Sequence, residues 1–166
     1  QHQLKLEGVA AENLQARIRG VIVMAYSNSK GRLAVATCNK SELACGYSTI
    51  YGDAVGGYAP INDLLKTRVW EISRWRNKAA AAGMGIGGLH IVGNEQGSAG
   101  VPLPDGVMIP VNSIEKAPSA ELRPGQKDSD SLPEYALLDQ VLAMYIEHAH
   151  GRADLLADGF DEATVD

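Results

Sequence analysis

The sequence has few aromatic residues, few cysteines and no long hydrophobic run. Aromatic residues make up 5% of its 166 residues and include one phenylalanine, whereas glycine contributes 18 residues. A core without large rings must be built from alanine, valine, isoleucine and leucine, with many tight turns and close backbone approaches. This composition is typical of an α/β domain, and the length suits one compact domain.

The lack of long apolar segments and of surplus basic residues argues against two classes of partner. The longest apolar stretch near the amino end, residues 21–25, is far shorter than the ~18–20 residues that cross a bilayer, and the opening residues lack the apolar core of a secretory signal. Lys and Arg number 15 against 20 Asp and Glu, which gives a net charge of −5; a general nucleic-acid binder needs a cationic surplus. We therefore expect a cytoplasmic protein that binds neither nucleic acid nor membrane.

Three patterns resemble ligand motifs but favour structural interpretations. Cys38 and Cys45 form no C-x-x-C pair and follow no export signal, which predicts reduced thiols. The glycines of residues 83–88 satisfy G-x-G-x-x-G, but they follow an alanine-rich helix end instead of a strand. His148 and His150 lie two residues apart, on different faces of a helix, so they do not converge on a metal.

The first half of the chain reads as half of an α/β repeat. Over residues 12–28 the apolar positions fall on one stripe of an amphipathic helix: Leu14, Ile18, Val21, Ile22 and Ala25. Gly31 follows the expected helix end. Residues 32–37 are a short apolar run after that turn, which predicts a buried parallel strand.

The remaining elements are predicted from caps and turn residues. We expect a short helix from Ser41, a helix over residues 64–82 capped by Asp63, and a helix near residues 135–145 that begins at a capping box over residues 131–134. Residues 159–165 resemble the cap and first turn of another helix. The glycine-rich residues 83–108 predict a loop or an inserted flap.

The densest cluster of chemically able residues follows the predicted strand. A strand end followed by a helix start exposes unpaired backbone N–H groups, which suits a phosphate or a carboxylate. Glu42 could hold a hard cation such as Mg²⁺, and Lys66 could neutralise a polyphosphate. On local grounds Glu42 could equally serve as a helix N-terminal carboxylate, and the whole loop could be merely solvated.

Three motifs, in matching order and separation, resemble the synthetase domain of glutamine-dependent NAD synthetases. They are residues 12–20 (ENLQARIRG), residues 36–42 (ATCNKSE) running on into residues 46–60 (GYSTIYGDAVGGYAP), and residues 118–124 (PSAELRP) with Gln126, Asp128 and residues 132–135 (LPEY).

This resemblance implies a partial α/β domain with a Rossmann-like parallel sheet and helices on both faces, the adenine nucleotide alpha hydrolase-like fold of ATP-pyrophosphatases. It implies that the carboxylate of deamido-NAD attacks the α-phosphate of ATP, that pyrophosphate leaves, and that ammonia, derived from glutamine, displaces AMP. The expected partners are deamido-NAD, ATP, Mg²⁺ and ammonia or glutamine, in a homo-oligomer. Residues 1–166 would form the partial domain, inactive by itself.

The same resemblance assigns roles to individual residues. Lys66 and Glu42 would be catalytic, with Glu42 on Mg²⁺ and facing the substrate. ATP would contact Thr37, Lys66 and Ser119. Deamido-NAD would contact Asn13 and Arg17, one turn apart on one helix face, and its nicotinate side would be lined by Tyr47, Ser48, Thr49 and Ile50.

The chain departs from the family pattern in ways that keep alternatives open. The Ser-Gly-Gly-x-Asp-Ser phosphate loop, the basic C-terminal segment and the glutaminase domain are not in these residues, and Cys38 replaces an expected glycine beside Thr37. Another ATP-pyrophosphatase ligase would share the region of Thr37 and Glu42 but not residues 47–60. A non-catalytic nucleotide-binding or assembly module is the third interpretation.

Overall fold

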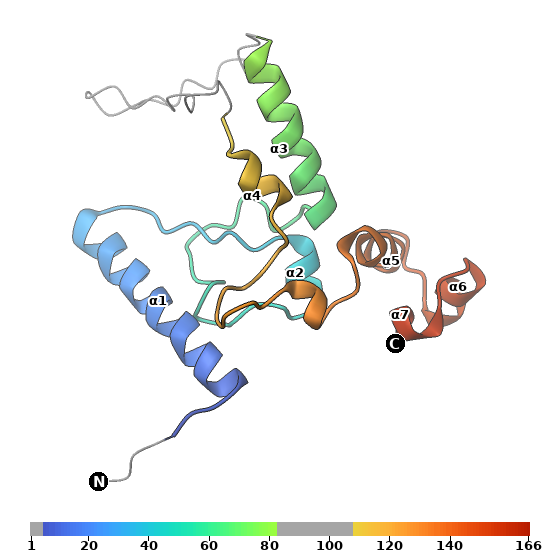
Figure 1. Ribbon diagram of the computed structural model, residues 1–166, viewed down its shortest axis with the longest axis horizontal. Helices are drawn as coiled ribbons and strands as arrows, with labels where there is room; N and C mark the ends of the chain where they lie inside the picture. The colour runs from blue at the N-terminus through green and yellow to red at the C-terminus, as the bar shows by residue number, and fades with distance from the viewer. Residues whose placement is uncertain (1–4, 83–107) are drawn as a thin grey trace. The chain divides into compact units, whose positions relative to one another are not determined.

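The computed structural model describes residues 5–82 and 108–166. By compactness the chain divides into two units, one formed by Gln1–Thr67 and Pro118–Asp166 and the other by Arg68–Ala117. The described α-helices, labelled in Figure 1, are α1 Val9–Lys30, α2 Lys40–Ala44, α3 Lys66–Ala81, α4 Val111–Glu115, α5 Tyr135–Glu147, α6 Arg152–Ala157 and α7 Glu162–Val165. A 3₁₀ turn lies at Asp128–Asp130. The predicted glycine-rich loop lies outside the described residues except for its last position.

Helix α1 confirms the predicted helix but turns its apolar stripe outward. Leu14, Ile18, Val21 and Ile22 are 45–68% exposed. The buried positions of the helix are Ala16 and Gly20, where the backbone of residues 51–52 approaches so closely that a Cβ on Gly20 would lie 2.6 Å from the carbonyl oxygen of Tyr51. Small side chains therefore make the contact, and the large ones are left on the other side.

The predicted buried strand at residues 32–37 is only partly present. Val35 forms an isolated parallel bridge with Tyr58, through hydrogen bonds from Ala36 N–H to the Tyr58 carbonyl (2.9 Å) and from Gly57 N–H to the Ala34 carbonyl (2.9 Å). Ala34 and Ala36 are buried, whereas Leu33 and Val35 are exposed. Within the described ranges no named strand forms, because this segment is paired on one side only and alternate side chains remain outside.

The short helix expected from Ser41 is α2, and its start is well capped. Asn39 is the N-cap: its side chain accepts a hydrogen bond from Glu42 N–H at 3.0 Å. In return a Glu42 carboxylate oxygen accepts from Asn39 N–H at 3.2 Å. This reciprocal pair satisfies two N–H groups that the first helical turn leaves open.

The prediction that Asp63 caps the next helix is wrong. Helix α3 begins at Lys66, and Asp63 is an exposed partner of Lys40, with Nζ and Oδ1 3.2 Å apart. The first N–H groups of α3 are instead bound by Ser41 and by Asp139, which lie far away in the sequence. The cap is a tertiary contact.

The C-terminal helices belong to the same unit as α1 and α2. Helix α5 packs against α2 and buries Leu138, Val141 and Leu142, as its apolar spacing predicts. Its N-cap is Glu134 without a side-chain hydrogen bond, so the predicted capping box over residues 131–134 is not formed. The predicted start of another helix near residue 161 is confirmed as α7, with Asp161 as its N-cap.

The second unit contains α4 and α3 from Arg68 onward. The Asn77 side chain on α3 donates to the Ile109 carbonyl (2.8 Å) and accepts from the N–H groups of Met108 (3.0 Å) and Ile109 (2.9 Å). Ala79 and Ile114 are buried in this unit. In neither unit does a described helix have the length and apolar character that a membrane span requires.

Candidate functional site

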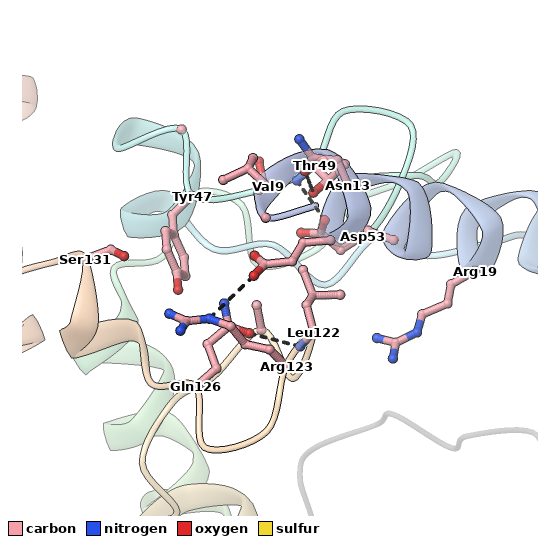
Figure 2. A pocket seen from close by; sticks show the side chains of 16 residues that line it. Val9, Asn13, Arg19, Tyr47, Thr49, Asp53, Leu122, Arg123, Gln126 and Ser131 are labelled. Carbon is pink, nitrogen blue, oxygen red and sulfur yellow. Dashed lines mark hydrogen bonds and ion pairs between the residues drawn. The ribbon is translucent and has the colours of Figure 1, made fainter. Parts of the chain in front are cut away.

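A pocket of about 620 Å³ lies in the first unit. Its walls come from the start of α1, from the segment after α2 and from residues 120–131. Figure 2 shows Asn13, Thr49 and Asp53 on one side of this pocket and Leu122, Arg123 and Gln126 on the other. The pocket is therefore formed by the same three stretches of sequence that carry the motifs.

Four of the predicted substrate residues line this pocket: Asn13, Tyr47, Ser48 and Thr49. The Thr49 hydroxyl lies 2.9 Å from Asn13 Oδ1, to which it donates, and Thr49 N–H donates to an Asp53 carboxylate oxygen at 2.7 Å. These bonds hold the loop after α2 against α1 and keep Asn13 and Thr49 together.

Three predicted substrate residues are not in the pocket lining: Arg17, Ile50 and Glu42. Of these, Arg17 lies four positions after Asn13 in the sequence, and Ile50 directly follows Thr49. Arg17 and Ile50 contact each other, because Arg17 Nε donates to the Ile50 carbonyl oxygen at 3.2 Å. Arg17 is exposed, and so is Ile50. Helix α1 and the loop after α2 therefore have a second contact, on the side of α1 where the Arg17 side chain is exposed.

Glu42 and Lys66 are brought together although 24 positions separate them. Their side chains form an ion pair with Oε1 and Nζ 2.9 Å apart, and each side chain is less than one-fifth exposed. The other Glu42 oxygen is the one that completes the cap of α2. One carboxylate oxygen of Glu42 therefore caps α2, and the other pairs with the Lys66 ammonium.

The other two predicted ATP residues, Thr37 and Ser119, lie outside the pocket lining. Thr37 is an exposed residue at the end of the 32–37 segment. Ser119 is half-buried, and its hydroxyl accepts from Glu121 N–H at 3.1 Å. Neither residue lines the pocket, and neither do Glu42 and Lys66, although these two contact each other.

Cys38 takes its place beside Thr37 without the backbone conformation of a glycine. Its φ is not positive, unlike that of Tyr51, Glu121 and Ala149. The thiol is free and buried. Burial, and then the nearby carboxylates of Asp53 and Glu42, raise the pKa of Cys38 from 9.0 to about 11, so this thiol is a neutral packing group at neutral pH.

Residues that sequence reasoning left without a role gather beside Tyr47. Tyr135 donates its hydroxyl to a buried Asp128 carboxylate oxygen at 2.8 Å, while the other Asp128 oxygen has no partner among the described residues. Burial, and then Asp128, raise the pKa of both Tyr47 and Tyr135. The Lys66 ammonium lies 5.5 Å from the centre of the Tyr135 ring.

Arg123 is a further pocket residue without a predicted role. Its guanidinium lies 3.5 Å from carboxylate oxygens of Glu12 and of Asp130. Glu12 also lines the pocket. The signal was available in the sequence, since Glu12 and Arg123 belong to two of the three motifs, but no spacing rule pairs residues so far apart.

Comparison with known proteins decides the family. The family model described as NAD synthase matches residues 1–166. The chain belongs to the NAD synthase family. The glutamine-dependent NAD(+) synthetase of Rhodobacter capsulatus is 47% identical over 157 residues, which are 95% of this chain and 25% of that protein. The protein of the same name from Thermotoga maritima is 43% identical over 157 residues, 95% of this chain and 23% of that protein.

Solved structures support the fold that the resemblance implied. An NH3-dependent NAD synthetase from Campylobacter jejuni matches with a TM-score of 0.58 at 23% identity, over 98% of this chain and 49% of that one. The NMN synthetase of Francisella tularensis matches with a TM-score of 0.58 at 25% identity, over 88% of this chain and 47% of that one. These neighbours support an α/β fold of the ATP-pyrophosphatase type, although the parallel sheet is represented in the described residues by one bridge.

The chain spans about a quarter of the length of the curated relatives that it matches.

Proposed function

We propose that this chain is part of the synthetase domain of a glutamine-dependent NAD synthetase, where it helps to join ammonia to deamido-NAD at the expense of ATP. The observation that carries the proposal is the Glu42–Lys66 pair. Family resemblance assigns these two residues to magnesium and to ATP phosphate, and the fold brings them within 2.9 Å of each other. Family membership supports the same chemistry.

The reaction requires activation because a carboxylate is a poor electrophile. In the proposed sequence the nicotinate carboxylate of deamido-NAD attacks the α-phosphorus of ATP, the bond to the bridging oxygen breaks, and pyrophosphate leaves with that electron pair. Ammonia then attacks the acyl carbon, AMP departs, and the nitrogen loses a proton. Lys66 would offset charge on the phosphates, while Asn13, Tyr47, Ser48 and Thr49 would bind deamido-NAD in the pocket.

Glu42 fits a magnesium ion that arrives with the nucleotide. No cluster of three metal-ligating side chains is present in residues 5–82 and 108–166, and Mg²⁺ typically takes one or two carboxylates together with phosphate oxygens and water. When bound, the ion would neutralise phosphate charge. Glu42 would supply its Oε1 atom, which pairs with Lys66 Nζ.

Arg17, Ile50, Thr37 and Ser119 complete the proposed site. Arg17 would reach deamido-NAD from the exposed side of α1, and its bond to the Ile50 carbonyl would orient the guanidinium. Thr37 and Ser119 would contact ATP. The parallel sheet with helices on both faces, and a partial synthetase domain over residues 1–166, belong to this proposal as well.

The exposed stripe of α1 supports a homo-oligomer. Leu14, Ile18, Val21 and Ile22 form an apolar surface on the same helix as Arg17, and such surfaces mark contacts between proteins. We propose that a second copy covers it, in a cytoplasmic enzyme. Sedimentation of the protein and of a Val21→Glu, Ile22→Glu double variant tests this: the variant should sediment as a smaller species, and an unchanged assembly would contradict the contact.

Calorimetry of the full-length protein that carries these residues tests the main proposal. We expect magnesium-ATP and deamido-NAD to bind at separate parts of one site. Lys66→Met should weaken magnesium-ATP about tenfold or more, because it removes a charge-assisted contact, and should leave deamido-NAD affinity within twofold. Asn13→Ala should do the reverse.

A matched control is Lys78→Met, which removes a lysine in the last turn of the same helix α3. It should change neither affinity. If the wild-type protein binds ATP but not deamido-NAD, the alternative ligase is favoured. Because one solved neighbour is named an NMN synthetase, nicotinate mononucleotide is the competitor to include; stronger binding of that mononucleotide would overturn the choice of the dinucleotide. If neither nucleotide binds, the result favours the interpretation of the chain as a non-catalytic assembly module.

A further inference from the structure

A buried carboxylate on α5 links the first turns of α2 and α3. Asp139 is 4% exposed. One of its oxygens accepts the Ser41 hydroxyl at 2.5 Å, and the other accepts Thr67 N–H at 2.7 Å. No resemblance or family motif gave this residue a role, and it touches neither the pocket nor Lys66 Nζ.

The network continues to the backbone of Lys66. The Ser41 oxygen that donates to Asp139 also accepts Lys66 N–H at 2.9 Å. The two N–H groups that open α3, those of Lys66 and Thr67, are therefore both satisfied by this Ser41–Asp139 unit. A helix start buried without such acceptors would leave donors that cost free energy.

The same two helix starts carry the functional pair. Ser41 is followed directly by Glu42 in α2, and Lys66 directly precedes Thr67 in α3. Asp139 binds Ser41 in α2 and Thr67 in α3. Their neighbours in the sequence, Glu42 and Lys66, form the ion pair. Helices α2 and α5 lie side by side (Figure 1), and Asp139 reaches the junction from α5.

We propose that Asp139 is a positioning residue for the nucleotide site: by fixing the starts of α2 and α3 through Ser41 and Thr67, it sets the distance between Glu42 and Lys66. This rests on the proposed function, which gives those two residues to magnesium and phosphate. A hydrogen-bonded carboxylate buried at the start of α3 also favours that helix end electrostatically, and the rigid junction keeps Lys66 aimed before ATP arrives.

The variants separate hydrogen bonding from charge. In Asp139→Asn the amide oxygen can accept Thr67 N–H while the NH₂ group donates to the Ser41 oxygen, so most of the geometry survives. Asp139→Ala removes both acceptors. Ser41→Ala deletes the hydrogen bonds of Ser41 to Asp139 and to Lys66 N–H, but it leaves the bond between Asp139 and Thr67 N–H. The control is Glu147→Gln, on the same helix α5, which weakens an exposed pair between Glu147 and Lys40 of α2 (3.1 Å) but not the junction.

The first measurement is ligand affinity in the full-length protein. We expect Asp139→Ala to raise the dissociation constant for magnesium-ATP about tenfold, the equivalent of one hydrogen bond to a charged group, with deamido-NAD affinity within twofold. Ser41→Ala should show a smaller loss, Asp139→Asn should retain most of the affinity, and Glu147→Gln should match the wild type. Unchanged ATP affinity in Asp139→Ala overturns the proposal, and so does an equal loss for both ligands, which would indicate a general loss of stability.

The second measurement does not depend on nucleotide binding. The rate at which an amine-reactive ester labels Lys66, followed by mass spectrometry, reports whether the ammonium still pairs with Glu42. Labelling should accelerate in Asp139→Ala and in Ser41→Ala but not in Glu147→Gln, and equal rates in all variants overturn the proposal. If the wild type binds no ATP, the proposed function fails while this labelling result still decides the role of Asp139. If Asp139→Ala does not fold, Ser41→Ala decides both measurements.

Discussion

Replacing Gly20 by alanine sets two effects of opposite sign against each other. Gly20 lies inside α1, where alanine is favoured over glycine by about 1 kcal/mol. The added Cβ, however, would lie 2.6 Å from the Tyr51 carbonyl oxygen and 3.1 Å from that of Gly52. Ordinary contact begins near 3.4 Å, so the helix and the loop would have to separate by roughly 0.8 Å.

The loop cannot withdraw freely. Gly52 N–H donates to the Thr49 carbonyl (2.9 Å), Thr49 N–H donates to Asp53, and Arg17 holds the Ile50 carbonyl. Forcing an extra carbon into such a contact typically costs about 1–3 kcal/mol. We therefore expect the clash to exceed the gain in helix propensity, with a net loss of up to about 2 kcal/mol in the free energy of unfolding.

Urea unfolding followed by far-ultraviolet circular dichroism measures this loss, and the chain offers a matched control. A Cβ on Gly57 would meet Leu33 Cδ1 at 2.7 Å, nearly the same distance, but that atom is the tip of an exposed side chain that can rotate away. Gly57→Ala should cost less than about 0.5 kcal/mol. A Gly20→Ala protein that is as stable as the wild type or more so would refute the reasoning, as would equal losses in the two variants.

Three further changes have defined outcomes. The folded chain keeps the Cys38 proton up to pH about 11, whereas the unfolded chain releases it near pH 9.0. The stability conferred by the neutral thiol is therefore complete below pH 9 and is lost as the pH rises to 11. In urea unfolding, the free energy of unfolding of Cys38→Ala should fall less steeply with alkaline pH than that of the wild type. Asn77→Ala removes three hydrogen bonds and should destabilise the second unit by about 2–3 kcal/mol, with faster hydrogen exchange at Ile109 N–H, whereas Asn77→Asp should retain protection there. Tyr135→Phe takes the hydroxyl donor from the buried Asp128 carboxylate and should cost about 1–3 kcal/mol, a loss that thermal unfolding would detect.

Local patterns in the sequence predicted most of the helices. The periodicity of residues 12–28 identified α1, and the polar residue before residues 162–165 identified α7, because both signals lie within a few residues of the element. The cap of α3 could not be predicted in this way. Its acceptors, Ser41 and Asp139, are 25 and 72 positions from the N–H groups that they bind.

The choice of Glu42 and Lys66 came from the sequence, but the contact between them did not. Local chemistry and motif resemblance both selected these two candidates, and the fold placed them together. The direction in which α1 faces was not predictable, because its apolar stripe would ordinarily indicate the buried side. Close backbone approach at Gly20 and Gly52 decides that direction, and a hydrophobic pattern carries no information about such contacts.

Helix α1 packs against the protein through Ala16 and Gly20. Substitutions on its two sides therefore have different consequences in protein engineering. On the docking side even one methyl group is too much. On the outer side Val21 and Ile22 contribute little to the fold of a single copy, so soluble, well-behaved preparations for spectroscopy can be sought by placing charges there without touching the pocket.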